Sequence, residues 1–249
     1  MKNKTKLLIF IGVIAISLLA CSTLTGGGNN TGNTSGDTTG NTTGNTAGNT
    51  TGNDTGGDTG GDTIVEPTDI LYQDDFSDPN TGWDIYTDED GLTDYENGAY
   101  KIGIYTDTYF YWANPYQNFG DVIVEVEAQK TTGGDDMQYG VICRHLDVDN
   151  WYALVISGDG FAAIRKRYQG GDLEYIADWV QVGAVNTGNS TNTLRAECVG
   201  SRLSLYVNDT LAIETNDADI ASGDVGLMAG TFDQSNTEVL FDNFVVRKP

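Results

Sequence analysis

The chain of 249 residues carries 36 acidic and 13 basic side chains, for a formal net charge of −23. Binding of nucleic acid needs a cationic surface, so this composition argues against nucleic acid as a partner. The single histidine, His145, leaves little material for a catalytic triad or a histidine-rich zinc site. We interpret His145 as an ordinary, half-exposed strand residue. The sequence offers no cofactor motif.

Residues 1–21 have the features of a secretory signal, with a basic start, an apolar run over 7–19 and the ending Leu-Leu-Ala-Cys. This ending resembles the lipobox of lipoprotein signal peptides. The resemblance implies cleavage before Cys21, lipidation of its sulfur, and a mature protein anchored to the cell membrane or surface. The alternative is an uncleaved N-terminal anchor, for which the apolar run is short. Either way, the rest of the chain is predicted to be extracytoplasmic.

Residues 22–65 are predicted to be a disordered tether. They consist of Thr, Gly, Asn and Asp with almost no apolar side chains, and from Gly32 to Gly60 a glycine recurs every fourth residue. No repeat carries a face that it could bury, so a solenoid is excluded. Asn-x-Ser/Thr triplets permit glycosylation here, although such triplets also arise by chance in this composition.

Residues 66–249 are predicted to form one all-β domain, because no convincing helical periodicity occurs in them. Residues 121–128 alternate with period two, placing Val122, Val124 and Val126 on one side and two glutamates on the other. Further strands are predicted over 139–146, 151–157, 161–168, 193–198, 202–208, 211–214, 225–229 and 238–247. About a dozen short strands separated by Gly, Asn and Asp turns are typical of an antiparallel two-sheet sandwich.

The central segment, 139–168, is predicted to be a three-stranded meander with two different faces. The inward face collects apolar side chains, namely Val141, Cys143, Tyr152, Leu154, Ile156, Ala162 and Ile164. On the opposite face, the predicted register places Arg144, Ala153 and Arg165 in one cross-strand row, and Trp151 beside Arg167 in the next. The arginines suit a binding surface, and in so acidic a chain they equally suit salt bridges.

Cys143 and Cys198 both lie in predicted strands at positions that point inward. Outside the membrane a disulfide between them is permitted. Two buried free thiols are the alternative, because the sequence does not give the distance between their Cα atoms.

Six segments, in this order, resemble the concanavalin A-like jelly-roll domains of the laminin G-like and DUF1080 (3-keto-disaccharide hydrolase-like) group. They are DDFSDPNTGW (74–83), NGAYKI (97–102), YGVICRHLDVDNWYALVIS (139–157), LRAECVGSRLSLYVND (194–209), GDVGLMA (223–229) and VLFDNFVVR (239–247). The resemblance implies two stacked antiparallel sheets, adjacent first and last strands, and a concave sheet that often holds a carbohydrate. The group is functionally broad, so the fold alone does not determine the chemistry.

Our leading hypothesis is non-catalytic binding of an extracellular glycan by a monomeric domain, with Arg144, Trp151, Arg165 and Trp179 forming the groove. Aromatic rings stack on the apolar face of a sugar, and planar polar groups orient its hydroxyls. Each tryptophan could instead belong to the core. The first alternative is a glycoside or 3-keto-glycoside hydrolase, although no carboxylate pair stands out at the spacing that glycosidases use. The second is a laminin G-like module that binds protein through an exposed apolar patch.

A structural Ca²⁺ site is predicted at Asp242 and Asp75. Asp242 lies in the middle of an apolar strand, and a buried carboxylate needs a partner. Domains of the resembled group often hold calcium between the first and last strands, which would pair Asp242 with Asp75 or its neighbour Asp74. The alternative is that Asp242 accepts backbone hydrogen bonds at a β-bulge.

Overall fold

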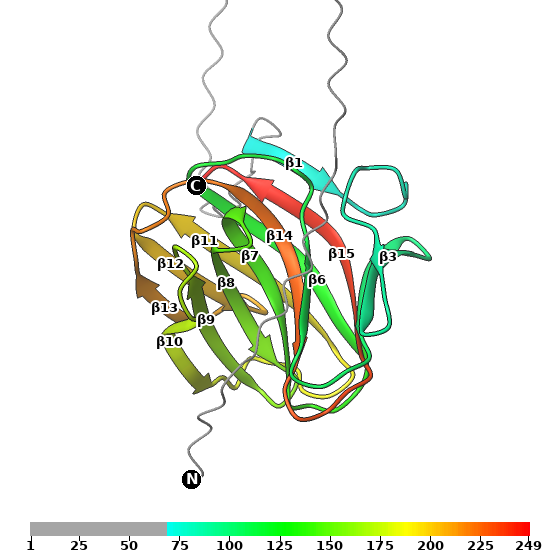
Figure 1. The fold of residues 1–249 in the computed structure, drawn as a ribbon. Helices are drawn as coiled ribbons and strands as arrows, with labels where there is room; N and C mark the ends of the chain where they lie inside the picture. The colour runs from blue at the N-terminus through cyan, green and yellow to red at the C-terminus, as the bar shows by residue number, and fades with distance from the viewer. Residues whose placement is uncertain (1–68) are drawn as a thin grey trace, which may run out of the picture. The chain divides into compact units, whose positions relative to one another are not determined.

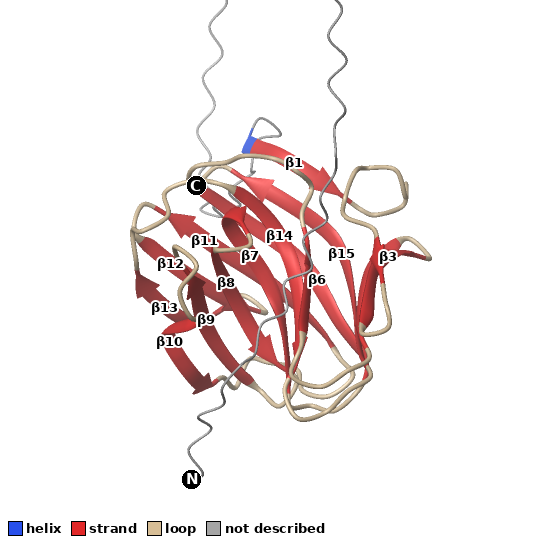
Figure 2. Ribbon diagram, viewed as in Figure 1, coloured by secondary structure: helices blue, strands red, loops and turns tan. Residues whose placement is uncertain are grey.

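The computed structural model describes residues 69–249, which form two packed antiparallel sheets (Figure 1). Within these residues there is no α-helix, and strands and loops build both layers; the short blue segment before β1 in Figure 2 is a 3₁₀ turn at Asp69. The predicted jelly-roll sandwich is therefore confirmed. The predicted signal peptide, the lipidation of Cys21 and the tether over 22–65 lie outside the described residues and stay predictions. In the described part, no helix is long and apolar enough to cross a membrane.

The larger sheet has nine strands in the order β13-β12-β11-β6-β15-β4-β3-β2, with β1 also paired to β15. Its strands are β1 (Ile70–Asp74), β2 (Tyr86–Thr87), β3 (Gly91–Glu96), β4 (Ala99–Ile104), β6 (Val122–Thr132), β11 (Thr191–Val199), β12 (Arg202–Val207), β13 (Thr210–Asn216) and β15 (Thr237–Arg247). Strands β1 and β15 are antiparallel neighbours, which confirms the expected adjacency of the first and last strands.

The smaller sheet has six strands in the order β10-β9-β8-β7-β14-β5. Its strands are β5 (Phe110–Ala113), β7 (Met137–Asp147), β8 (Asn150–Ser157), β9 (Phe161–Arg167), β10 (Glu174–Gln181) and β14 (Asp224–Thr231). Strands β1 to β5 and β10 have no counterpart among the runs predicted above. Most of them are short, and β10 is largely exposed without a regular alternation.

The main core lies between the two sheets and contains the inward face predicted for the meander. Val122, Val124 and Val126 of β6 are buried, whereas Glu127 is exposed, as the alternation predicted. Period-two alternation therefore identified the core side of these strands.

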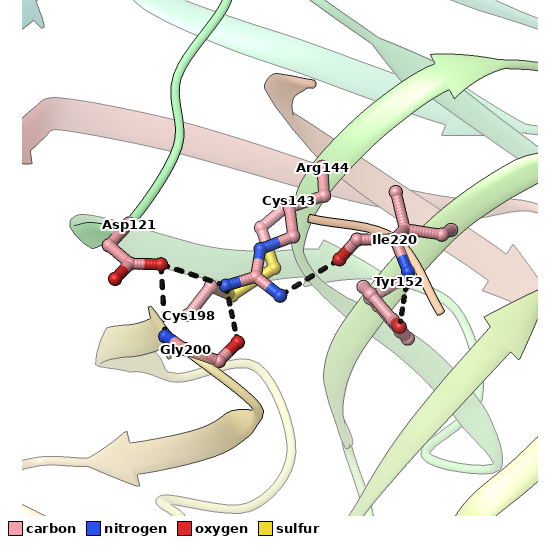
Figure 3. Close-up of a disulfide and its surroundings, with 7 residues drawn as sticks. All are labelled: Asp121, Cys143, Arg144, Tyr152, Cys198, Gly200 and Ile220. Carbon is pink, nitrogen blue, oxygen red and sulfur yellow. Dashed lines mark hydrogen bonds and ion pairs between the residues drawn. A yellow bond between two sulfur atoms is a disulfide. The ribbon is translucent and has the colours of Figure 1, made fainter. Parts of the chain in front are cut away.

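A disulfide between Cys143 of β7 and Cys198 of β11 joins the two sheets (Figure 3). The disulfide, and not the pair of free thiols, is therefore the correct alternative. The two cysteines are 55 residues apart in the sequence, and a loop of that length corresponds to about 4 kcal/mol of stabilisation from the lost entropy of the unfolded chain.

The register predicted for Arg144 is wrong. Ile142, not Arg144, pairs with Ala153, which in turn pairs with Arg165. The cause is a bulge in β7 between Cys143 and Asp147, where Arg144 has a φ of 54°. At the turn Asp147 pairs with Asn150, and beyond the bulge Cys143 pairs with Tyr152, which is a shift of two residues. A register counted outward from the turn therefore fails beyond the bulge.

The guanidinium of Arg144 instead connects three loops beside the disulfide (Figure 3). It donates to the carbonyl oxygens of Ile220 and Gly200 at 2.9 and 2.8 Å, and it forms an ion pair of 3.1 Å with Asp121. Arg144 is 2% exposed. The salt-bridge interpretation therefore describes Arg144, which holds loops together at this end of the sandwich.

Candidate functional site

The outer face of the six-stranded sheet, which points away from the larger sheet, carries a second apolar cluster. It consists of Ile142, Trp151, Ala153, Val155, Ala163 and Met228, each at most 2% exposed. Large side chains from both edge strands pack on it, Phe110 and Trp112 from β5 and Trp179 from β10. The centre of the face is therefore covered by side chains and is not an open groove.

Three of the four predicted binding residues lie on this outer face. Trp151 is buried, and its indole N–H donates to the carbonyl oxygen of Val148 at 3.1 Å. Arg165 is buried as well, while Trp179 is half-buried, 6.1 Å from the ring of Phe232. The predicted groove of four residues is thus not formed, because Arg144 lies elsewhere and two others are covered.

An open pocket of about 430 Å³ lies beside Trp112. Its lining combines an indole ring, amides, a phenol, an imidazole and two carboxylates, from Trp112, Asn114, Gln117, Tyr116, His145, Asp84 and Asp224. These residues come from the loop before β2, from β5 and the segment after it, and from β7 and β14. Mixed aromatic and polar lining of this size is typical of a site for a small polar ligand.

Hydrogen bonds fix both carboxylates. Asp224 accepts from the backbone N–H groups of Gln117 and Val225 at 3.0 and 2.8 Å. One oxygen of Asp84 accepts from the backbone N–H of Asn114 at 2.9 Å, and the other accepts from the hydroxyl of Tyr116. The segment that follows β5 is therefore held across the pocket by two acids from distant parts of the chain.

Burial dominates the electrostatics of the pocket. It raises the pKa of Asp224 to about 6, although the backbone N–H donors oppose the shift. Burial also lowers the pKa of His145, whose Nε2 has no hydrogen-bond partner among residues 69–249. The hydrogen bond to Asp84 raises the pKa of Tyr116 to about 12. At neutral pH the imidazole beside the carboxylates is therefore neutral, and its Nε2 is buried.

Sequence reasoning missed the residues of this pocket. His145 is half-buried, close to the half-exposed residue that the sequence predicted, but its place in the pocket was not foreseen. Trp112, His145 and Asp224 come together through the pairing of β14 with β5 and β7. Asp84 joins them through its hydrogen bonds to Asn114 and Tyr116. The aromatic run over 109–112 was the one signal in the sequence, since one side of such a run must face away from the core.

The predicted calcium residues do not make a calcium site by themselves. Asp242 is half-exposed at a bulge in β15, where its carboxylate accepts from the backbone N–H of Asn243 at 2.7 Å. Asp75 is exposed and binds Ser77. Calcium takes six to eight oxygens, and residues 69–249 contain no group of three or more His, Cys, Asp or Glu side chains placed to bind a metal. The expected burial of Asp242 was wrong, because the bulge turns this part of β15 outward.

Comparison with solved structures shows the same jelly-roll fold. The carbohydrate-binding module CBM66 from Bacillus subtilis is 18% identical, with a TM-score of 0.55 over 67% of this chain and 96% of that one. A protein of unknown function with a galectin-like fold, also from Bacillus subtilis, is 13% identical, with a TM-score of 0.52 over 72% and 96%. The β-glucanase of Bacillus licheniformis is 13% identical, with a TM-score of 0.51 over 72% and 97%. No family model and no curated protein sequence matches the chain. At these identities the likeness shows the fold alone.

Proposed function

We propose that the protein binds an extracellular glycan, without catalysis, in the pocket beside Trp112. The observation that carries this proposal is the lining of the pocket, where an aromatic ring lies next to amides and carboxylates. The half-buried indole of Trp112 offers an apolar face for the C–H side of a sugar ring. The amides of Asn118 and Gln117, together with the carboxylate of Asp84, offer donors and acceptors for sugar hydroxyls.

Binding is favoured over hydrolysis by the hydrogen bonds of the acids. Both oxygens of Asp84 already accept a hydrogen bond from the protein, and one oxygen of Asp224 accepts two. Asp84 is thereby held as a fixed acceptor on both oxygens, whereas the nucleophile or general base of a hydrolase needs an oxygen free to react. The fold is compatible with this function, since a carbohydrate-binding module is among the similar structures.

We place this activity outside the cell, on a lipid-anchored protein. The support is the lipobox-like ending at Cys21 with the signal-like segment before it, followed by the Thr/Gly/Asn tether. The disulfide between Cys143 and Cys198 adds support, because structural disulfides persist in oxidising compartments. Metabolic labelling with a clickable fatty acid tests the anchor, since replacement of Cys21 by serine must abolish the labelling.

One observation favours a second candidate, a glycoside hydrolase. The pKa of Asp224, raised to about 6, would let this residue keep a proton in weakly acidic solution while Asp84 lies in the same pocket. Two acids in different protonation states are what glycoside hydrolysis requires. This candidate predicts release of reducing sugar that is lost in both D84N and D224N.

A glycan array probed with the purified protein tests the proposal, followed by analysis of the bound glycan for cleavage. We expect binding of a defined glycan class with no turnover. Repeating the array with a chelator tests the predicted calcium site at Asp242 and Asp75 separately, because loss of binding would implicate the metal. A blank array would overturn the proposal, and cleavage of the glycan would establish the hydrolase instead.

A further inference from the structure

Arg165 of β9 is a buried cation without a counter-ion. The residue is 0% exposed, and none of the ion pairs among residues 69–249 involves it. Its Nη1 donates to the side-chain oxygen of Gln138 at 2.5 Å, whereas Nε and Nη2 have no hydrogen-bond partner in the described part of the chain. Its carbon Cζ lies 5.1 Å from the centre of the Tyr175 ring.

The other buried cations of the described residues show how unusual this is. Lys130 pairs with Asp135 at 2.7 Å, Arg144 with Asp121 at 3.1 Å, and Lys166 with two aspartates. The chain has 36 acids, yet no acid among residues 69–249 forms an ion pair with Arg165. Desolvation lowers the pKa of Arg165 to about 10, so the charge remains at neutral pH. A buried, unpaired charge is costly to stability, and its retention calls for a reason.

The two free donors of Arg165 are arranged for one kind of partner. Nε and Nη2 lie along the same edge of the planar guanidinium, with their N–H bonds nearly parallel. This edge matches the two oxygens of a carboxylate in a bidentate pair. Gln138 holds the opposite side of the guanidinium and so fixes its plane.

The ring over the guanidinium of Arg165 is that of Tyr175, which belongs to the edge strand β10. Tyr175 and Trp179 of β10 have ring centres 6.1 Å apart, and the Tyr175 side chain is 41% exposed. The pairing of β10 with β9 shifts register on both sides of Ala177. A strand with two irregularities and a single partner adjusts more easily than a central strand. A rotation of the Tyr175 side chain would therefore expose the guanidinium of Arg165 to a ligand.

We propose that Arg165 and Gln138, beneath Tyr175 and its neighbour Trp179, form a binding site for the carboxylate of a uronic acid. The guanidinium edge would bind the two carboxylate oxygens, and the rings of Tyr175 and Trp179 would contact the apolar face of the sugar. The inference goes beyond the pocket at Trp112, because none of these four residues lines that pocket. It gives the outer face of the sheet a second site, for an acidic sugar.

The test is calorimetric titration of the full protein with glucuronic acid, galacturonic acid, glucose, acetate and inorganic phosphate. We expect the uronic acids to bind and glucose not to bind. Affinity should fall at least tenfold in R165M, and also in R165K, because an ammonium cannot form the bidentate pair. Y105A serves as the control, because Tyr105 is partly exposed and belongs to neither site, so its uronic acid affinity should equal that of the wild type.

Melting temperature provides a readout besides binding. R165M removes an unpaired buried charge and is expected to melt at the same temperature as the wild type or higher, whereas R144M should melt several degrees lower. Three results would overturn the proposal: uronic acid affinity unchanged in R165M, acetate or phosphate bound as tightly as the uronic acids, or a melting temperature of R165M that falls as far as that of R144M. The last result would show that Arg165 is a purely structural residue.

Discussion

Asp224 of β14 pairs directly with His145 of β7, and both side chains line the pocket beside Trp112. Burial shifts the pKa values of the two side chains in opposite directions. It raises the pKa of Asp224 to about 6 and lowers the pKa of His145. Each shift favours the neutral form. The charge of the pocket is therefore expected to change in weakly acidic solution.

The raised pKa of Asp224 predicts a specific dependence of stability on pH. From the unperturbed value of 3.8 up to about 6, the folded state holds this proton more tightly than the unfolded state. The contribution of Asp224 to stability is therefore present at low pH and is lost as the pH rises through 6. As the pH rises over this range, the wild type should lose unfolding free energy that D224N keeps. The stability of D224N relative to the wild type should therefore increase, as measured by urea denaturation.

Asp217 supplies the control for that measurement. Its pKa is lowered, with burial opposing the effect of Lys166 and Tyr152, so its contribution is present above the unfolded pKa and lost as the pH falls. D217N should therefore lose stability relative to the wild type at neutral pH. A D224N profile parallel to the wild type would contradict the assigned shift.

Removal of the disulfide should weaken the link between the sheets. The double variant C143A/C198A is expected to lose about 4 kcal/mol of unfolding free energy, because the unfolded chain regains the entropy of a long closed loop. Urea denaturation of the wild type with and without reductant gives the same comparison without mutation. Loss of less than about 1 kcal/mol would show that the cross-link does not constrain the unfolded chain as described.

Arg144 is expected to act on stability and not on ligand binding. R144M would leave the carbonyl oxygens of Ile220 and Gly200 without this donor and would remove the ion pair with Asp121, at a cost of about 3 kcal/mol. Arg247 offers a matched control, because its pair with Glu125 is partly exposed and R247M should cost under about 1 kcal/mol. Equal losses in the two variants, measured by chemical denaturation, would contradict the role given to Arg144.

Gly140 is required by close packing between strands. A Cβ at this position would lie 2.2 Å from the carbonyl oxygen of Leu154 and 2.8 Å from the Cα of Val155, so G140A forces β7 away from β8. We expect a loss of about 1–3 kcal/mol. G183A is the control, since a Cβ at Gly183 meets no atom within 4 Å. A G140A variant as stable as G183A would contradict the register of these strands.

The two-faced meander was predictable because alternation decides which side of a strand meets the core. Cys143, Tyr152 and Ile164 lie in the core as expected. The position of Arg144 was not predictable, since a bulge shifts the register without leaving a mark in the hydrophobic pattern. The same holds for Asp242, whose strand bulges where the pattern suggests continuous burial.

The pocket was beyond sequence reasoning for a different reason. Trp112, His145 and Asp224 are brought together by strand pairs between distant segments, and no local spacing reports such pairs. Arg165 was selected from the sequence as a ligand-binding candidate, but its burial under Tyr175 depends on the irregular edge strand β10. Residue types indicated the chemistry, whereas long-range topology determined which residues share a site.

The most direct test of the central claim is calorimetric titration of the wild type, W112A and Y105A with the glycan identified on the array. Trp112 lines the pocket, whereas Tyr105 is a partly exposed ring outside its lining. Loss of one stacking ring should weaken binding at least tenfold in W112A, measured at a temperature at which both variants are folded, while Y105A should bind like the wild type. Wild-type affinity in W112A would contradict glycan binding in this pocket.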